Sequence, residues 1–230
     1  MCIRDSDNLQ YVVTRGAAPE RVGRIPTGDM IADAHLQPPA TRASVAPELG
    51  LDGRPFMVIV SRLEPSKHPD CALLVLAALR ATHPEAALVV IGDGSIREAL
   101  ERQARELGID DDVRFVGVRE QGWIARALSS ASVVLCPYSG LALVEAALSG
   151  TPIVAYDVEW HGELISSGEN GLLVPFGDTG AMAQAAESLL LDRARGAAIA
   201  ATARSQALHE MDRADAVAAK RSAYAAVCAP

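Results

Sequence analysis

The stretch Phe56-Met57-Val58-Ile59-Val60 reads as one strand of a parallel sheet. All five residues are apolar, and a continuous apolar run of this length is typical of a strand buried on both faces. The polar loop Ser61-Arg62-Leu63-Glu64-Pro65-Ser66-Lys67 follows directly. An apolar helical pattern then covers residues 69–82, with Pro69 in the first turn, where proline is tolerated. Strand, loop and helix in this order form the repeating unit of α/β proteins.

The same pattern repeats along the rest of the chain. It predicts further strands at residues 87–91, 113–116, 132–135, 152–155 and 171–174. It predicts further helices at residues 95–107, 121–130, 141–148, 179–191, 193–210 and 212–227. Ser95 and Glu98 have the spacing of a capping box at the start of one of them. We therefore expect an α/β protein with a Rossmann-like, doubly wound parallel sheet and extra C-terminal helices.

Three segments differ in composition. Residues 1–50 are irregular and read as an N-terminal remnant and linker, with short strands expected at Tyr11-Val12-Val13 and at residues 22–25. Residues 51–192 hold the alternating pattern, and residues 193–230 hold only helices. The opening Met1-Cys2-Ile3-Arg4-Asp5-Ser6 resembles a translated adapter sequence, so we expect the C-terminal part of a longer protein.

Composition excludes several classes of function. The chain has 230 residues, half of them apolar, and a net charge of −8, which argues against nucleic acid as a partner. No apolar run reaches the ~20 residues of a transmembrane helix. The cysteines have no CxxC spacing, which favours buried, reduced thiols at Cys71 and Cys136. We expect a cytoplasmic protein, which the missing part of the longer protein could hold peripherally at the membrane.

Glu145 is the single charged residue between Arg126 and Asp157. It follows the glycine turn Ser139-Gly140 on a short apolar helix. A buried carboxylate needs hydrogen-bond donors, and vicinal ribose hydroxyls supply two. The N–H groups at the start of the same helix attract phosphates. The alternative is an ordinary helix acid that reaches solvent past small alanines.

Arg62 and Lys67 lie between the first regular strand and its helix. Ligands of parallel sheets bind beyond the C-terminal ends of the strands, so both cations stand where a diphosphate would bind. The alternative is an ordinary surface loop.

Other motifs are weaker. Gly92-x-Gly94 matches part of a dinucleotide fingerprint, but Arg97 replaces its third glycine. The acids Asp110-Asp111-Asp112 precede a strand, at the wrong end of the sheet for a metal site, so we expect a solvated turn. His161 and Glu163 follow another strand, where we expect a weak ligand role for His161 and a structural role for Glu163.

Taken in order, several segments resemble the C-terminal, donor-binding domain of GT-B glycosyltransferases of family 4. The resemblance spans about residues 22–191. It is carried by Val58-Ile59-Val60-Ser61-Arg62-Leu63-Glu64-Pro65-Ser66-Lys67, Val90-Ile91-Gly92-Asp93-Gly94, Val113-Arg114-Phe115-Val116-Gly117, Leu143-Val144-Glu145-Ala146, Gly150-Thr151-Pro152-Ile153-Val154-Ala155 and Gly168-Glu169-Asn170-Gly171-Leu172-Leu173-Val174.

The resemblance implies a retaining transferase that moves a sugar from a nucleotide-diphosphate sugar to an unknown acceptor, without a metal or cofactor. Residues 51–192 would then bind the donor. Arg62 and Lys67 would hold the diphosphate and Glu145 the ribose. The implied substrate contacts are Ser61, Gly92, the base-contacting Val116, Gly117 and Val118, and the turn formed by Ser139, Gly140, Leu141 and Ala142.

The sequence departs from the family at two positions. The family has a sugar-contacting glutamate eight residues before the ribose acid, where this chain has Pro137, and a glycine where it has Ser61. Tyr138 or Ser139 could replace the sugar contact. Pro137 also favours a non-catalytic nucleotide-sugar-binding module, while a GT-B epimerase and a dinucleotide oxidoreductase remain alternatives. The family's acceptor-binding domain would be a further partner, without which we expect donor binding but poor transfer.

Overall fold

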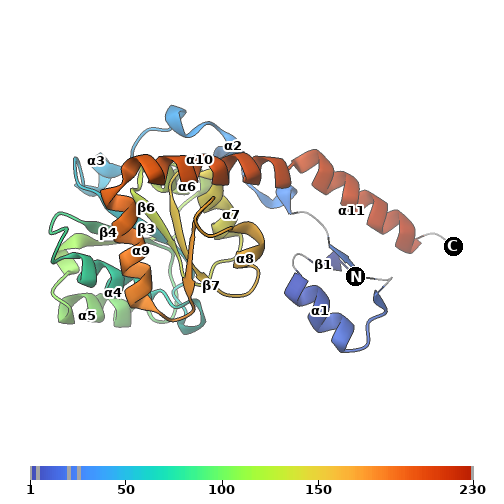
Figure 1. Cartoon of the computed structure of the whole chain (residues 1–230), viewed down its shortest axis with the longest axis horizontal. Coiled ribbons are helices and arrows are strands. Elements are labelled where there is room, and N and C mark those ends of the chain that lie inside the picture. The colour runs from blue at the N-terminus through green and yellow to red at the C-terminus, as the bar shows by residue number, and fades with distance from the viewer. Residues whose placement is uncertain (1, 4–5, 20–21, 25–26, 229–230) are drawn as a thin grey trace.

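In the computed structural model, the centre of the protein is a six-stranded parallel sheet with strand order β5-β4-β3-β6-β7-β8 (Figure 1). The structure describes residues 2–3, 6–19, 22–24 and 27–228. The strands are β3 (Phe56–Val60), β4 (Ala87–Ile91), β5 (Val113–Gly117), β6 (Val133–Cys136), β7 (Ile153–Asp157) and β8 (Leu172–Pro175). The predicted fold class is confirmed.

The strand order reverses at β3. The chain runs from β3 through β4 to β5 on one side, and then returns to β6 on the other side of β3. Met57 and Val58 are in register with Leu88 and Val89 of β4 and also with Val133 and Val134 of β6. The gap between the loops after β3 and β6 is therefore the topological switch point, where ligands of such sheets bind.

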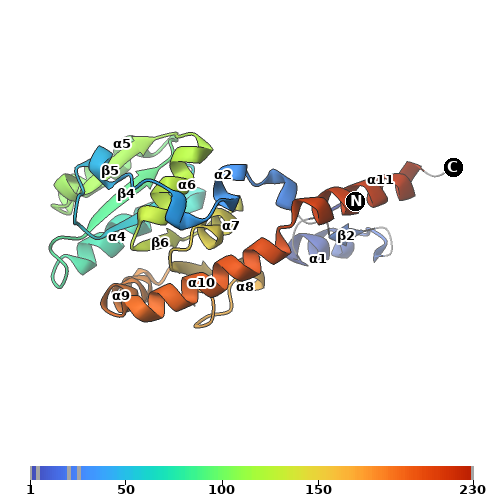
Figure 2. The same cartoon turned by 90° about the horizontal axis from the view of Figure 1, so that it is seen from above.

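Helices cover both faces of the sheet (Figure 2). Alternate residues of β3 point to opposite faces, with Met57 and Ile59 in one core and Phe56 and Val58 in the other. The first core includes residues of α4 (Asp70–Leu79), α5 (Arg97–Glu106) and α9 (Thr179–Leu191). The second includes residues of α6 (Gln121–Ser130) and α7 (Leu141–Leu148). Shorter helices are η4 (Pro65–Lys67), η5 (Asp110–Asp112) and α8 (His161–Leu164).

The two ends of the chain meet around the second core. The helix α10 (Arg193–Glu210) packs on α7 and α9, and α11 (Arg213–Cys228) extends away from the sheet in both views (Figures 1 and 2). The N-terminal segment forms β1 (Cys2–Ile3), α1 (Ser6–Thr14), β2 (Gly23–Arg24), η2 (Gly28–Met30), α2 (Asp33–Leu36), η3 (Pro39–Thr41) and α3 (Ala46–Leu49). Within the described ranges, every helix is too short or too polar to cross a bilayer.

Some local predictions were wrong. Tyr11-Val12-Val13 belongs to α1 rather than to a strand. In the segment expected to be a strand at 22–25, β2 covers Gly23–Arg24, and residue 25 lies outside the described residues, as do residues 1, 4 and 5 of the adapter-like opening. Ser95 does not cap α5, because its N–H and hydroxyl bind the Glu64 carboxylate and the helix begins two residues later. Cys71 and Cys136 are buried free thiols as predicted, and burial raises the pKa of each to about 12.

Candidate functional site

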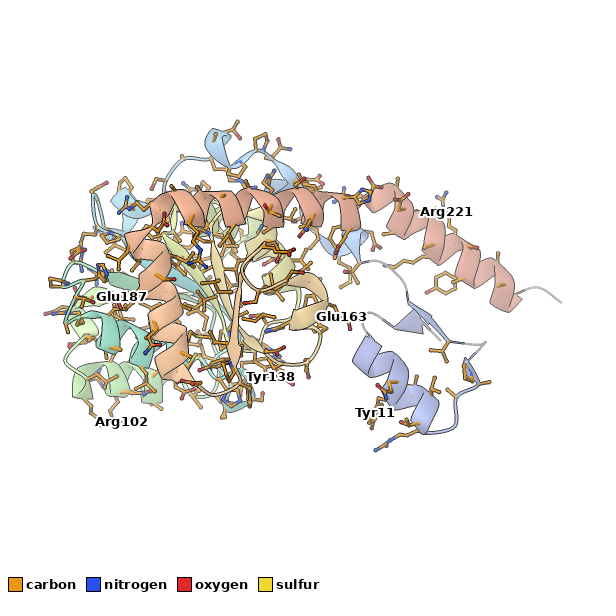
Figure 3. All side chains as sticks on the ribbon, viewed as in Figure 1. Tyr11, Arg102, Tyr138, Glu163, Glu187 and Arg221 are labelled. Carbon is orange, nitrogen blue, oxygen red and sulfur yellow. The ribbon has the colours of Figure 1, made fainter. Side chains whose placement is uncertain are left out.

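A cavity of ≈ 460 Å³ lies at the C-terminal edge of the sheet, at the switch point between β3 and β6. Figure 3 labels one lining residue, Tyr138, at the lower edge of the sheet. The loops after β3, β4, β5 and β6 and the starts of α6 and α7 all contribute to the wall. The lining residues are Val60, Ser61, Arg62, Lys67, Ile91, Gly92, Asp93, Val118, Arg119, Gln121, Ile124, Tyr138, Ser139, Gly140, Leu141 and Ala142.

Backbone hydrogen bonds join three of these loops to one another. Ser61 N–H donates to the Ile91 carbonyl at 3.0 Å, and Leu63 N–H donates to the Asp93 carbonyl at 2.9 Å. Gly92 N–H in turn donates to the Gly117 carbonyl at 2.9 Å. The sheet ladder therefore continues past the strand ends, so this wall of the cavity has a fixed shape.

Two glycines make this contact between loops possible. Gly92 has a φ of +132°, and a Cβ there would lie 1.8 Å from the Ser61 carbonyl oxygen. A Cβ on Gly94 would lie 2.4 Å from the Leu63 carbonyl oxygen. The partial Gly-x-Gly match therefore reflects close packing of two backbones, a role that glycine alone can fill.

Arg62 and Lys67 both line the cavity, as the strand-end argument predicted. Arg62 is exposed and its guanidinium makes no hydrogen bond or ion pair with the described residues, although its charge helps to lower the pKa of Glu64 after the two hydrogen bonds from Ser95. The Lys67 ammonium lies 4.6 Å from the centre of the Tyr138 ring. Neither cation is neutralised by a carboxylate within the described chain, so both are available to an anion.

Arg119 is a third cation in the wall, and the sequence analysis did not identify it. Its guanidinium lies 5.0 Å from the centre of the Trp123 ring, and the indole N–H of Trp123 donates to Glu48 at 2.9 Å. Its position, two residues beyond the end of β5, was the signal that could have found it.

The start of α7 faces the cavity with unpaired N–H groups. Gly140 precedes the helix without a side-chain cap, and the N–H groups of Gly140, Leu141 and Ala142 have no acceptor in the part of the chain that the structure describes. Such a helix start attracts negative charge, through its free donors and the helix dipole.

His161 supports this turn from behind. Its ring is buried, with Nδ1 2.9 Å from the Tyr156 carbonyl oxygen and Nε2 3.1 Å from Ser139 N and 3.0 Å from the Ser139 carbonyl oxygen. The ring therefore joins the end of β7 to the backbone of Ser139. His161 is not a lining residue, so the expected ligand role is replaced by one in positioning the turn. Glu163 lies in the first turn of α8, as expected.

Glu145 lies behind the wall rather than among the lining residues. It stands one helical turn after Leu141 on the same face of α7, and its side chain is 11% exposed. Burial raises the pKa of its carboxyl group. No hydrogen bond from a described residue reaches the carboxylate, and His35 Nε2 lies 3.8 Å from its Oε1.

His35 and Gln121 complete this corner, and both were missed by the sequence analysis. His35 is fully buried, and its Nε2 lies 2.7 Å from Gln121 Oε1 while its Nδ1 has no partner. Burial lowers the pKa of His35, the hydrogen bond to Gln121 opposes this, and the Arg42 charge lowers it further. Nε2 carries the proton, because the opposite tautomer would bury an unpaired N–H and turn a lone pair toward Glu145. The Gln121 oxygen is thus occupied, and its amide N–H groups are left for the cavity.

The predicted site residues divide into two groups. Those that line one cavity are Arg62, Lys67, Ser61, Gly92, Val118, Ser139, Gly140, Leu141 and Ala142. Val116 and Gly117 precede the lining residue Val118 without lining the cavity themselves, and Glu145 lies behind the α7 wall. His35 could not have been found, because a lone histidine in an irregular segment carries no signal.

The sequence model of the family described as "Glycosyl transferases group 1" matches residues 42–206. The chain belongs to this family. The resemblance identified from the sequence is therefore correct, and the matched residues include every element that lines the cavity.

Curated relatives are identical to this chain at about a third of the aligned positions. The D-inositol 3-phosphate glycosyltransferase of Nocardia farcinica is 36% identical over 198 residues, which cover 81% of this chain and 43% of that protein. A GDP-mannose-dependent alpha-(1-6)-phosphatidylinositol monomannoside mannosyltransferase of Mycolicibacterium smegmatis is 32% identical over 187 residues, covering 76% and 49%. The chain spans about half the length of these relatives.

Solved structures show the same fold. The Anabaena protein HepE in complex with UDP superposes with a TM-score of 0.85 at 22% identity, over 98% of this chain and 62% of HepE. HepE has also been solved with UDP-glucose, with a TM-score of 0.84. WaaG, a glycosyltransferase involved in lipopolysaccharide biosynthesis, superposes with a TM-score of 0.81 at 20% identity, over 100% of this chain and 62% of WaaG.

Proposed function

We propose that this chain is the donor-binding part of a retaining, metal-independent glycosyltransferase, and that its cavity binds a nucleotide-diphosphate sugar. The observation that carries the proposal is the convergence of Arg62, Lys67 and the open start of α7 on one cavity. Two separate segments, the loop after β3 and the start of α7, present positive charge or N–H groups there, and neither cation forms an ion pair with a described residue. A diphosphate is the ligand that this combination fits.

The diphosphate lies between the β3 loop and α7 in this proposal. Arg62 binds it with a bidentate fork, Lys67 acts as a point charge, and the N–H groups of Leu141 and Ala142 donate to its oxygens. When the bond to the sugar breaks, negative charge grows on the departing diphosphate. Fixed cations and backbone donors stabilise that charge and take the place of a metal ion.

The nucleoside occupies the side of the cavity next to α6. Glu145 accepts hydrogen bonds from the ribose hydroxyls. The Gln121 amide lies close to Glu145, because Gln121 Oε1 and Glu145 Oε1 are both within 3.8 Å of His35 Nε2. The base lies against the loop from Val116 to Val118. The names of relatives that act on GDP-mannose, and of structures holding UDP and UDP-glucose, support a nucleotide-sugar donor.

Pro137 favours one competing function. It is buried at the position where the family carries its sugar-contacting glutamate, so a nucleotide-sugar-binding module without turnover is the second candidate. Sugar transfer to an acceptor, assayed with the chain embedded in its full-length protein, separates the two.

Binding of UDP, GDP and ADP to the purified chain, measured by calorimetry, tests the proposal. Arg62→Ala should weaken binding of the preferred nucleotide by about 1.5–3 kcal/mol, because a charged hydrogen bond is lost. Lys67→Ala should act in the same direction.

Arg102→Ala is the matched control. Arg102 is exposed on α5, well apart from Tyr138 in Figure 3, and its removal changes the net charge by the same amount. If Arg62→Ala and Arg102→Ala bind the nucleotide equally well, the diphosphate assignment is wrong.

A further inference from the structure

A carboxylate on a neighbouring loop contacts one of the residues that line the cavity. Glu159 lies between β7 and α8, and its Oε1 accepts a hydrogen bond from the hydroxyl of Tyr138, which lines the cavity. Because β6 and β7 are adjacent, the loops that follow them meet at the same edge of the sheet. The hydrogen bond to Glu159 raises the pKa of Tyr138 to about 12, so the phenol remains a donor.

Two residues that contact Tyr138 have a strained backbone. Two non-glycine residues of the described chain have a positive φ, namely His68 at +50° and Glu159 at +48°. Both contact Tyr138, Glu159 through its carboxylate and His68 through its ring, 6.2 Å away between centroids. A left-handed conformation costs a residue with a Cβ about 1–2 kcal/mol. Two such residues around one side chain at a cavity indicate a functional constraint.

Tyr138 also belongs to an exposed aromatic surface. Its ring centroid lies 6.3 Å from that of Phe176, which is 50% exposed and follows β8. Lys67 lies over the Tyr138 ring and lines the same cavity. Lys67 and Tyr138 therefore line one end of the cavity, and Glu159 and Phe176, which do not line it, contact Tyr138 beside it.

We propose that Tyr138 and Glu159 form the sugar-binding end of the donor site and select a neutral hexose. The inference rests on the proposed function, since Lys67 would hold the phosphate that bears the sugar. One Glu159 oxygen is bound to Tyr138, and the other has no partner among the described residues, so it can accept a hydrogen bond from a sugar hydroxyl. The apolar face of the pyranose packs on the Tyr138 and Phe176 rings. A sugar with its own carboxylate is repelled by Glu159.

Calorimetry with UDP, UDP-glucose and UDP-glucuronate tests this inference on the full chain, with GDP and GDP-mannose in parallel. In the parent, the neutral sugar nucleotide should bind more tightly than the bare nucleotide. Glu159→Gln and Tyr138→Phe should leave the affinity for UDP or GDP within about twofold of the parent. They should reduce the advantage of the neutral sugar nucleotide by about tenfold, the effect of one charged hydrogen bond. Glu159→Gln should also bring the affinity for UDP-glucuronate closer to the affinity for UDP-glucose.

Glu169→Gln and Tyr224→Phe are the matched controls, because both residues are exposed and lie outside the cavity. The inference is overturned if the sugar advantage survives both test variants, or if the bare nucleotide weakens as much as the sugar nucleotide. If the parent binds no nucleotide, or if Arg62→Ala leaves nucleotide binding unchanged, the proposed function is overturned and this inference with it.

Discussion

Glu145 is a buried acid without a hydrogen-bond donor among the described residues. Burial raises the pKa of this carboxyl group, so the folded chain holds its proton more tightly than the unfolded chain does. The stability that results is complete below the ordinary glutamate pKa of 4.5 and is lost as the pH rises to the raised value. At neutral pH, well above the ordinary pKa, this acid therefore destabilises the ligand-free fold.

Glu145→Gln should accordingly stabilise the ligand-free chain at neutral pH. The gain should shrink as the pH falls toward 4.5, because the parent acid becomes neutral there as well. Urea unfolding across this range measures the effect, with the exposed Glu169→Gln as control. The same variant should bind nucleotide about tenfold more weakly if Glu145 holds the ribose. A variant that is less stable at neutral pH would show that the acid is paired after all.

Glu159 offers a direct measurement of backbone strain. Glu159→Gly and Glu159→Ala both lose the hydrogen bond to Tyr138, but only alanine keeps a Cβ at a φ of +48°. The glycine variant should therefore be about 1 kcal/mol more stable than the alanine variant in chemical denaturation. The same pair at Glu169, which has no positive φ, should show the opposite order.

At the scale of elements, the cavity depends on the contact between the β3 and β4 loops. Gly92→Ala should destabilise the chain by about 2–4 kcal/mol, because the new Cβ collides with the Ser61 carbonyl and the positive φ is strained as well. Binding of the nucleotide should fall with it, since Ser61 and Arg62 are displaced together. Thermal unfolding and calorimetry measure the two effects.

Gly108→Ala is the control for this loop contact. Gly108 has a φ of +67°, but nothing lies within 4 Å of its Cβ position, so the cost should be only about 1–2 kcal/mol and the affinity should be unchanged. Equal losses in the two variants would show that the contact between the loops is dispensable.

At the scale of the whole molecule, Arg204 joins the two ends of the chain at the site. From α10 its guanidinium donates to the carbonyls of Leu36 and Gln37 at 3.0 Å each, and also to that of Leu148 at the end of α7. The segment that it anchors carries His35, which in turn contacts Gln121 and Glu145. A residue outside the cavity therefore supports one of its walls.

Arg204→Ala should cost about 3 kcal/mol of stability, because several carbonyls lose a charged donor at once. It should also weaken nucleotide binding by loosening His35. Arg195→Ala, an exposed arginine on the same helix, should do neither. Chemical denaturation measures the loss of stability, and calorimetry measures nucleotide binding. An unchanged affinity in Arg204→Ala would show that His35 is held by other contacts.

The apolar runs, the loops that end them and the resemblance carried by their order were sufficient to predict the parallel sheet and the family. A buried strand can be predicted from its own residues, since five consecutive apolar residues are typical of a strand buried on both faces. The cations at the end of β3 could be placed for the same reason, because strand direction alone decides which edge they reach.

The remaining features depended on contacts between residues distant in sequence, and only the tertiary structure decided them. Ser95 binds Glu64 instead of capping its helix, because the β3 loop brings a carboxylate to it. His35 reaches Glu145 from a segment 110 positions earlier, and Glu159 reaches Tyr138 across two strand ends. Such pairings arise from packing, which sums interactions over the whole chain and leaves no pattern in any one stretch of it.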